Sequence, residues 1–199
     1  MCILLLYNNE ISINLYSELK NIGERVVLFP EKIDLNKIKK LNVSFVVSYN
    51  YRYIIGEDVI KYMNNKIVNL HTSFLPWNRG ANPNLWSFID NTPKGVTIHQ
   101  LSEKLDRGKI LLQKEVIFDE KKETFASSYK KLNNEIVKLF INNWKAIKNG
   151  ELLPEKQTGH GSYHTTKDYL ALKEKIDFTW DDNIYEFMQR YNKMIKEGE

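Results

Sequence analysis

The chain has 199 residues, a length typical of one domain with small additions, and its 42% apolar and 27% charged residues are ordinary for a globular protein. The 29 Lys and Arg residues exceed the 25 Asp and Glu residues by only four, which predicts neither an acidic disordered chain nor a basic nucleic-acid-binding surface. A single cysteine, Cys2, excludes an internal disulfide framework and a metal site built from paired cysteines.

The first half of the chain alternates short apolar runs with segments of helical length. We expect strands at residues 2–7, 25–29, 43–49 and 66–71, and helices at 11–21, 35–41 and 57–63. The strands are continuously apolar, which is typical of a parallel sheet covered on both faces. Right-handed crossovers then predict an α/β, doubly wound fold.

The second half continues with a loop at 71–81 and a helix that begins at Asn82-Pro83. Strands are expected at 95–101 and 110–118, joined by a tight loop. Apolar residues then recur every three or four positions from Phe125 to Ile147, which predicts a long helix ended by Gly150. Further helices are expected at 166–175 and 182–195. We therefore expect a main domain at 1–150 and a short helical C-terminal extension, 151–199, packed on it.

The apolar run at residues 3–7 is too short to span a membrane and lacks the basic flank of a signal peptide. We accordingly expect a cytoplasmic protein without a membrane partner. The sequence contains no GxxxxGK[ST] loop, no GxGxxG after the first strand and no HExxH. A nicotinamide enzyme is therefore disfavoured, and Cys2, at the start of a buried strand, is expected to be inert.

Asn69 and His71 end the fourth expected strand, and sites in open α/β sheets lie beyond the carboxyl ends of strands. The two side chains share one face because strand residues alternate with period two. An amide donor beside an imidazole suits a reaction that builds an oxyanion. The alternative interpretation is a polar strand end whose side chains bond to loop backbone.

Asp106 lies in the loop that follows a later strand, where it can approach His71 in space. A carboxylate there would orient the imidazole and raise its pKa. The three residues then form a general acid/base pair with an oxyanion donor. His99, inside the fifth long strand, is expected to be structural, and His164 is interpreted as a surface or turn histidine or as a substrate contact.

The segment from Asn69 to Gly80 reads Asn-Leu-His-Thr-Ser-Phe-Leu-Pro-Trp-Asn-Arg-Gly, and Gly95-Val-Thr and Leu105-Asp-Arg-Gly follow it. This pattern resembles the folate-dependent formyltransferase family. The resemblance implies a Rossmann-like formyltransferase topology, N10-formyltetrahydrofolate as the formyl donor, a primary amine as the acceptor and no metal. It places the family's catalytic residues on Asn69, His71 and Asp106.

The resemblance also implies where the folate binds. In the family the turn after the third strand holds the pterin, and that turn corresponds here to Arg52, Tyr53, Ile54 and Ile55. The loop that carries Leu105 would close the other side of the pterin.

Within the family, the stretch around Trp77, Asn78, Arg79 and Asn82 is most similar to the sugar N-formyltransferases. It implies a nucleotide-linked amino sugar as the substrate, whose N-formyl product enters surface glycan or polysaccharide, and it assigns those four residues to acceptor binding. The residues after Gly150 are few and not strongly basic, which disfavours a tRNA acceptor. Glycinamide ribonucleotide transformylase and a non-catalytic folate- or nucleotide-sugar-binding module remain alternatives, and a homodimer is left open.

Overall fold

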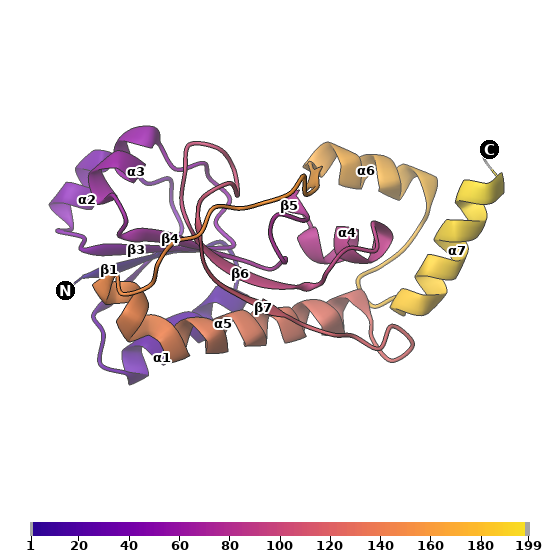
Figure 1. Ribbon diagram of the computed structural model, residues 1–199, viewed down its shortest axis with the longest axis horizontal. Coiled ribbons are helices and arrows are strands. Elements are labelled where there is room, and N and C mark those ends of the chain that lie inside the picture. The colour runs from indigo at the N-terminus through magenta and orange to yellow at the C-terminus, as the bar shows by residue number, and fades with distance from the viewer. Residues whose placement is uncertain (1, 198–199) are drawn as a thin grey trace.

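The structure is a computed structural model that describes residues 2–197. In chain order its elements are β1 Ile3–Leu6, α1 Ile11–Asn21, β2 Val26–Phe29, α2 Leu35–Lys40, β3 Phe45–Tyr49, α3 Glu57–Met63, β4 Ile67–His71, β5 Arg79–Gly80, α4 Pro83–Ile89, β6 Gly95–Gln100, β7 Ile110–Glu115, α5 Phe125–Asn149, β8 Tyr163–His164, α6 Thr166–Lys175 and α7 Ile184–Glu197 (Figure 1). The ends of the expected strands and helices differ from these by no more than three residues. The two short strands β5 and β8 lie in segments expected to be loops.

A six-stranded sheet with the order β2-β1-β3-β4-β6-β7 forms the centre of the fold. Strands β2, β1, β3 and β4 are parallel to one another. Strand β6 is antiparallel to both β4 and β7. The expected mostly parallel, doubly wound α/β sheet is therefore confirmed. Because β6 is antiparallel to β4, the end of β4 meets the start of β6, and the loop after β6 connects it directly to the antiparallel strand β7 without a crossover helix.

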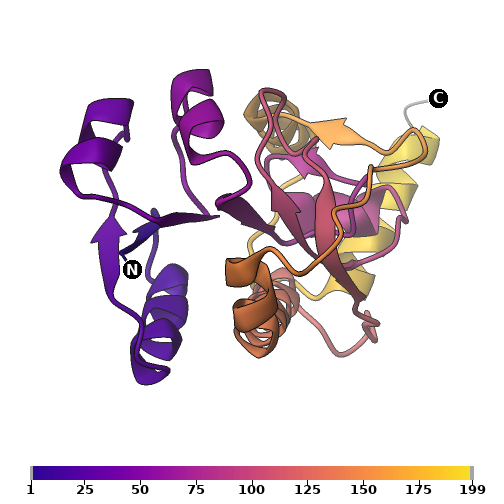
Figure 2. The same cartoon turned by 60° about the vertical axis from the view of Figure 1, so that its left-hand side comes forward.

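Alternate residues of the buried strands face two helical layers, as the pleat of a strand requires. Ile3 and Leu5 of β1 pack in the cluster that includes α1 and α5, whereas Leu4 and Leu6 pack in the cluster that includes α2 and α3. Figure 2 shows these two layers on opposite faces of the sheet. Burial on both faces explains why the strands read as continuous apolar runs.

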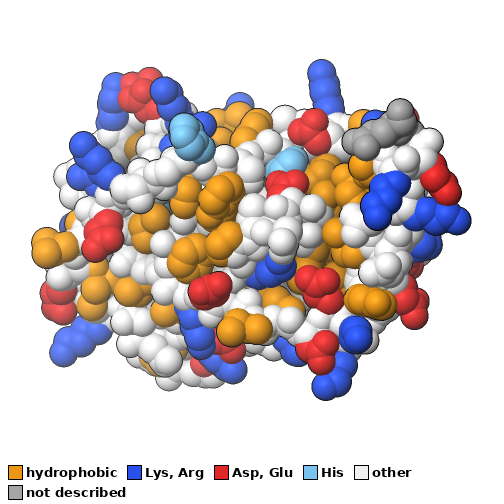
Figure 3. Space-filling model, turned by 45° about the vertical axis from the view of Figure 1, so that its right-hand side comes forward, with side chains coloured by type: hydrophobic (Ala, Val, Ile, Leu, Met, Phe, Trp, Pro, Cys, Tyr) orange, Lys and Arg blue, Asp and Glu red, His pale blue; other side chains and the backbone are white. Residues whose placement is uncertain are grey.

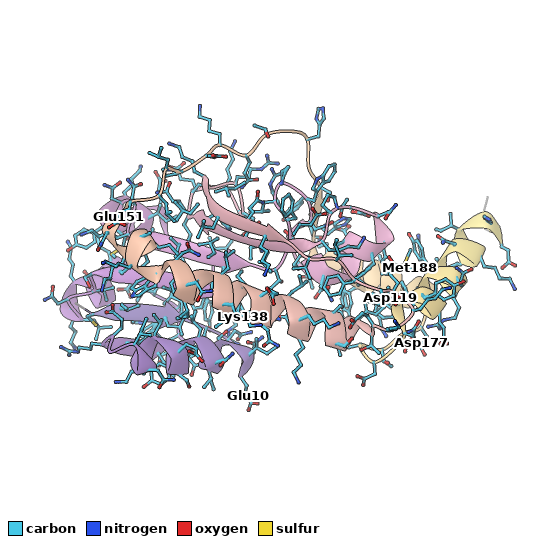
Figure 4. The ribbon with its side chains drawn as sticks, turned by 60° about the horizontal axis from the view of Figure 1, so that its bottom comes forward. Glu10, Asp119, Lys138, Glu151, Asp177 and Met188 are labelled. Carbon is cyan, nitrogen blue, oxygen red and sulfur yellow. The ribbon has the colours of Figure 1, made fainter. Side chains whose placement is uncertain are left out.

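The long helix α5 begins and ends at strong sequence signals. Thr124 and Ser127 form a reciprocal capping box at its start, and Gly150 adopts φ +70° directly after its end. Figure 4 shows the helix crossing the sheet beside α1, from the Asp119 end near α7 to Glu151. Its buried stripe supplies much of the core on that face.

The chain after α5 turns back across the molecule, as the orange segment in Figure 1 shows. It adds β8 beside β5 as a parallel pair, and α6 and α7 then pack with α4 and the start of α5 around a third apolar cluster centred on Phe125 and Phe187. His164 of β8 is fixed by two contacts with other residues. Its ring stacks on that of Trp86 with centroids 4.0 Å apart, and its Nε2 lies 2.7 Å from Asp90 Oδ2.

Charge is dispersed over the surface. On the face shown in Figure 3, Lys and Arg side chains alternate with Asp and Glu side chains around hydrophobic areas. Across residues 2–197, every helix is either too short or too polar to cross a bilayer.

A substitution at Phe187 can test whether α7 packs into an apolar core shared with α4 and α5. Its side chain is fully buried, and its ring centroid lies 5.1 Å from that of Phe125 on α5. We expect Phe187→Ala to lower the free energy of unfolding by about 3–5 kcal/mol, measured by urea denaturation, because it leaves a cavity. The matched control Ile195→Ala removes a half-exposed side chain from the same helix and should cost less than about 1 kcal/mol. Equal losses for the two variants would contradict this packing.

Candidate active site

Two strands bring an amide and two imidazoles together at the end of the parallel part of the sheet. Asn69 and His71 lie on β4, and the antiparallel register places His99 of β6 directly opposite Asn69. The Asn69 amide Nδ2 lies 3.2 Å from His99 Nε2. His71 and His99 are almost fully buried, with ring centroids 6.3 Å apart.

Asp106 completes this cluster from the loop between β6 and β7. Its Oδ2 accepts a hydrogen bond from the backbone N–H of Gly80 at 2.9 Å and lies 3.9 Å from His71 Nδ1. Its Oδ1 accepts a weaker bond from Asn69 Nδ2 at 3.4 Å and lies 3.6 Å from His99 Nε2. The expected approach of Asp106 to Asn69 and His71 is thus what the fold produces.

Two glycines make this convergence sterically possible. At Gly108 a Cβ atom would lie 1.6 Å from the carbonyl oxygen of Gln100, and at Gly80 it would lie 2.2 Å from that of His164. A side chain at either position would push the backbone away from its neighbour. The spacing Asp-x-Gly after β6 therefore has a geometric reason: the loop must fold tightly against the end of that strand to aim Asp106 inward.

His71 has two different ring nitrogens. Nε2 lies 3.1 Å from the carbonyl oxygen of Asn78, which can only accept, so Nε2 carries a hydrogen and the neutral ring has its lone pair on Nδ1. Burial lowers the pKa of His71 below its usual 6.5, although Asp106 acts in the opposite direction. This corrects the expectation that Asp106 raises the pKa overall, because desolvation outweighs the charge attraction.

Asp106 is ionised in spite of its burial. Burial acts to raise the pKa of this carboxyl, but His71, His99 and the N–H of Gly80 outweigh it and hold the pKa well below the usual range. At neutral pH the site therefore presents a carboxylate, a neutral imidazole with a free Nδ1, and an amide donor.

A cavity of about 1120 Å³ opens onto these groups, and Asn69, His71, His99 and Asp106 all line it. One part of its wall is formed by the turn after β3 and the loop after β6. Another part comes from elements distant in sequence: the start of α5, the start of α6 and Trp180 in the segment that precedes α7. The cavity is thus large enough for two ligands that meet at the polar cluster.

All the residues expected to bind the folate line this cavity: Arg52, Tyr53, Ile54, Ile55 and Leu105. Ile54 is 84% exposed and Leu105 is 55% exposed, so apolar surface faces the open space from both the turn and the loop. Exposed apolar side chains that gather at a cavity are typical of a binding site.

The residues expected to bind the acceptor divide into two groups. Asn82 lines the cavity. It occupies the N-cap position of α4, as the start of the helix at Asn82-Pro83 predicts, but its φ is +50° and its side chain makes no capping hydrogen bond. Trp77, Asn78 and Arg79 lie outside the cavity wall, contrary to expectation. Asn78 is fully buried and bonded to Thr92, because its loop folds inward under the returning C-terminal segment.

Sequence reasoning missed two residues of the site. His99 was expected to be structural, and its place beside Asn69 and Asp106 depends on the antiparallel register of β4 and β6, which no local pattern reveals. Trp180, which is 41% exposed, is the second; its only signal in the sequence is a Trp between the polar residues Thr179 and Asp181. Over residues 2–197 no group of three or more His, Cys, Asp or Glu side chains is arranged to hold a metal ion.

The protonation state of His71 can be tested by NMR. We expect its imidazole to titrate with a midpoint below 6.5, since burial favours the neutral form. Replacement of the Asp106 charge by Asp106→Asn should lower the midpoint further, because the carboxylate is the neighbour that favours the imidazolium. The signal is assigned by its loss in His71→Gln. A midpoint above 6.5, or a rise in the Asp106→Asn variant, would contradict this electrostatic account.

Comparison with known proteins agrees with this geometry. The structure of the formyltransferase PseJ from Anoxybacillus kamchatkensis, in complex with UDP-4,6-dideoxy-4-formamido-L-AltNAc and tetrahydrofolate, superposes with a TM-score of 0.85; it is 38% identical and the match covers 93% of this chain and 96% of that one. A dTDP-4-amino-4,6-dideoxyglucose formyltransferase of Mycobacterium bovis is 28% identical over 85% of this chain and 67% of its own length.

A methionyl-tRNA formyltransferase of Thermodesulfovibrio yellowstonii is 33% identical over 67% of this chain, and this chain spans 45% of that protein. The chain therefore spans less than half the length of that relative. Residues 8–143 match the family described as Formyl transferase, and these residues include Asn69, His71 and Asp106. The resemblance seen in the sequence is confirmed, and the chain belongs to the formyl transferase family.

Proposed function

We propose that this protein transfers a formyl group from N10-formyltetrahydrofolate to the primary amine of a nucleotide-linked amino sugar, giving an N-formyl sugar for surface glycan or polysaccharide. The observation that carries the proposal is the meeting of Asn69, His71 and Asp106 on one large cavity. The similarity to PseJ over 93% of the chain supports the choice of a sugar acceptor, because that relative holds both a nucleotide-linked formamido sugar and tetrahydrofolate.

The turn after β3 fits a pterin. Among the described residues, the backbone groups of Arg52–Ile55 have no hydrogen-bond partner, and they lie at the cavity wall. Free backbone donors and acceptors beside the apolar side chains of Ile54 and Leu105 suit a flat ring that has a polar edge. Such a site depends on backbone geometry, so the identity of the side chains matters less than the shape of the turn.

The chemistry assigned to the three polar residues follows from their atoms. The folate, when bound, supplies the formyl group. Asn69 Nδ2, which bonds weakly to Asp106 at 3.4 Å, can turn to donate to the formyl oxygen as negative charge develops there. His71 Nδ1 can take the proton that the attacking amine loses, and the resulting imidazolium faces the Asp106 carboxylate 3.9 Å away. The same imidazolium can return a proton to N10 as the bond between N10 and the formyl carbon breaks, which would release tetrahydrofolate.

The acceptor end of the cavity is proposed to lie at the start of α5 and at Trp180. Trp180 stacks on Tyr169 with ring centroids 5.9 Å apart and an angle of 6°, which holds the indole in a fixed orientation beside the cavity. Lys130 also lines this part and has no carboxylate within ion-pair distance among the described residues. A fixed indole and a cation suit the base and the phosphates of a nucleotide.

The proposed reaction is tested by incubation of the protein with N10-formyltetrahydrofolate and a panel of acceptors. We expect mass spectrometry to show a gain of one formyl group on a UDP- or dTDP-linked amino sugar. We expect no product with glycinamide ribonucleotide or with methionyl-tRNA. Transfer to one of these two alone would replace the proposed acceptor, and tight folate binding without any transfer would favour a binding module.

In the same assay Asn69→Ala should lower kcat by about 100- to 1000-fold, the usual effect of removing one oxyanion donor. His71→Gln and Asp106→Asn should also lower kcat strongly. The control Asn142→Ala changes an exposed amide on α5 and should leave kcat unchanged. The roles assigned to these residues fail if all three site variants keep full activity while they remain folded.

Trp180→Ala should raise KM for the nucleotide sugar about tenfold, since it removes a stacking surface for the base. KM for the folate should stay unchanged, because the folate residues line a different part of the cavity. Tyr62→Ala, which removes an exposed aromatic side chain from α3, serves as the control. An equal rise in both KM values for Trp180→Ala would indicate a general disturbance rather than acceptor binding.

A further inference from the structure

A side chain from the C-terminal connector reaches the loop that carries Asp106. Gln157 lies between α5 and β8, far from the catalytic motif in sequence. Its amide Nε2 donates to the backbone carbonyl of Asp106 at 2.7 Å and to that of Gly108 at 2.9 Å. Both hydrogens of the amide nitrogen are thereby used on one turn of the catalytic loop.

Arg79 fixes the orientation of this amide. The Arg79 side chain is 3% exposed, and its Nε and Nη2 donate to Gln157 Oε1 at 3.1 and 2.7 Å. Within the part of the chain that the structure describes, Arg79 has no carboxylate in ion-pair distance. Because the Gln157 oxygen receives two N–H groups from a buried guanidinium, its nitrogen must face the loop.

The backbone of Asp106 has an uncommon conformation. Its φ is +50°, in the left-handed region that few non-glycine residues adopt, although Asp and Asn enter it more readily than most. Its side chain is fixed by the N–H of Gly80, the residue after Arg79. The backbone carbonyl and the carboxylate of Asp106 are thus both tied to the Arg79–Gly80 strand, one through Gln157 and one directly.

We propose that Gln157 is a positioning residue that, clamped by Arg79, holds Asp106 in its left-handed conformation and aims its carboxylate at His71. Gln157 does not line the cavity, so it acts on the reaction through Asp106 and makes no contact with substrate. The proposal rests on the proposed function for its kinetic test. It also makes the connector of the C-terminal extension part of the catalytic unit.

The test compares Gln157→Met, which keeps the size of the side chain without its hydrogen bonds, with the exposed neighbour variant Lys156→Ala. We expect Gln157→Met to lower kcat roughly 10- to 100-fold with little change in KM for either substrate, because a displacement of about 1 Å in a catalytic group has this effect. Lys156→Ala should retain the kcat of the unaltered protein.

A second readout does not depend on the reaction. Besides Asp106, the groups that act on the pKa of His71 are His99 and Arg79, which favour the neutral ring, and the backbone carbonyl of Asn78, which favours the imidazolium. Gln157→Met changes no charge. If it releases Asp106, the NMR midpoint of His71 should fall, in the same direction as in Asp106→Asn. A folded Gln157→Met protein with an unaltered midpoint and unaltered kcat overturns the proposal.

A second variant, Gln157→Glu, tests the same proposal if Gln157→Met does not fold. The glutamate keeps an oxygen for Arg79 but presents a carboxylate oxygen, not N–H groups, to the carbonyls of Asp106 and Gly108. We expect a folded protein with kcat lowered as above; full activity of this variant would overturn the proposal. If the unaltered protein transfers formyl to no acceptor, the proposed function fails, whereas the His71 midpoint still decides the role of Gln157.

Discussion

The carboxylate of Asp106 stays ionised although it is buried beside Asn69 and His71 of β4 and His99 of β6. Burial opposes that charge, so partners from several segments have to compensate for it. The N–H of Gly80, the amide of Asn69 and the rings of His71 and His99 surround it. These groups belong to β4, β5 and β6, so the buried negative charge of Asp106 links all three strands to the loop after β6.

That linkage extends to the end of the chain. The strand that contains Gly80 pairs with β8, and Gly80 approaches the backbone of His164 so closely that no side chain fits between them. The apolar cluster around Phe125 packs α6 and α7 against α4 and the start of α5. Phe125 belongs both to this cluster and to the cavity wall, so the packing of the C-terminal helices also shapes that wall.

The cavity joins two chemically different surfaces at the polar cluster. Unpaired backbone groups and apolar side chains form the wall at the turn after β3, whereas a fixed indole and a cation form the wall near α5. Two ligands that differ in shape and charge can therefore be held against one amide and one imidazole. Proximity of this kind contributes to a group transfer before any proton moves.

The sequence by itself determined the order along the chain of the helices and of the six strands of the main sheet, but not the short strands β5 and β8. It also determined the ends of the long helix and the placement of Asn69 and His71 on one face of a strand. These depend on local pattern: continuous apolar runs, the period of a strand and the residues that begin or end a helix. For Asp106, local pattern predicted only a loop position from which it could approach His71. The resemblance to the family added the expectation that it is a catalytic residue.

The tertiary structure decided the rest. His99 enters the site through the antiparallel register with β4. Gln157 contacts the backbone of the Asp106 loop, and Trp180 lines the cavity, because the chain after α5 returns across the molecule. The same return buries Asn78 and Arg79, which sequence similarity assigned to the acceptor. Contacts such as Asn69 with His99, 30 positions apart, and Asp106 with Gln157, 51 positions apart, leave no periodic trace in the sequence, since each is set by how whole elements pack against one another.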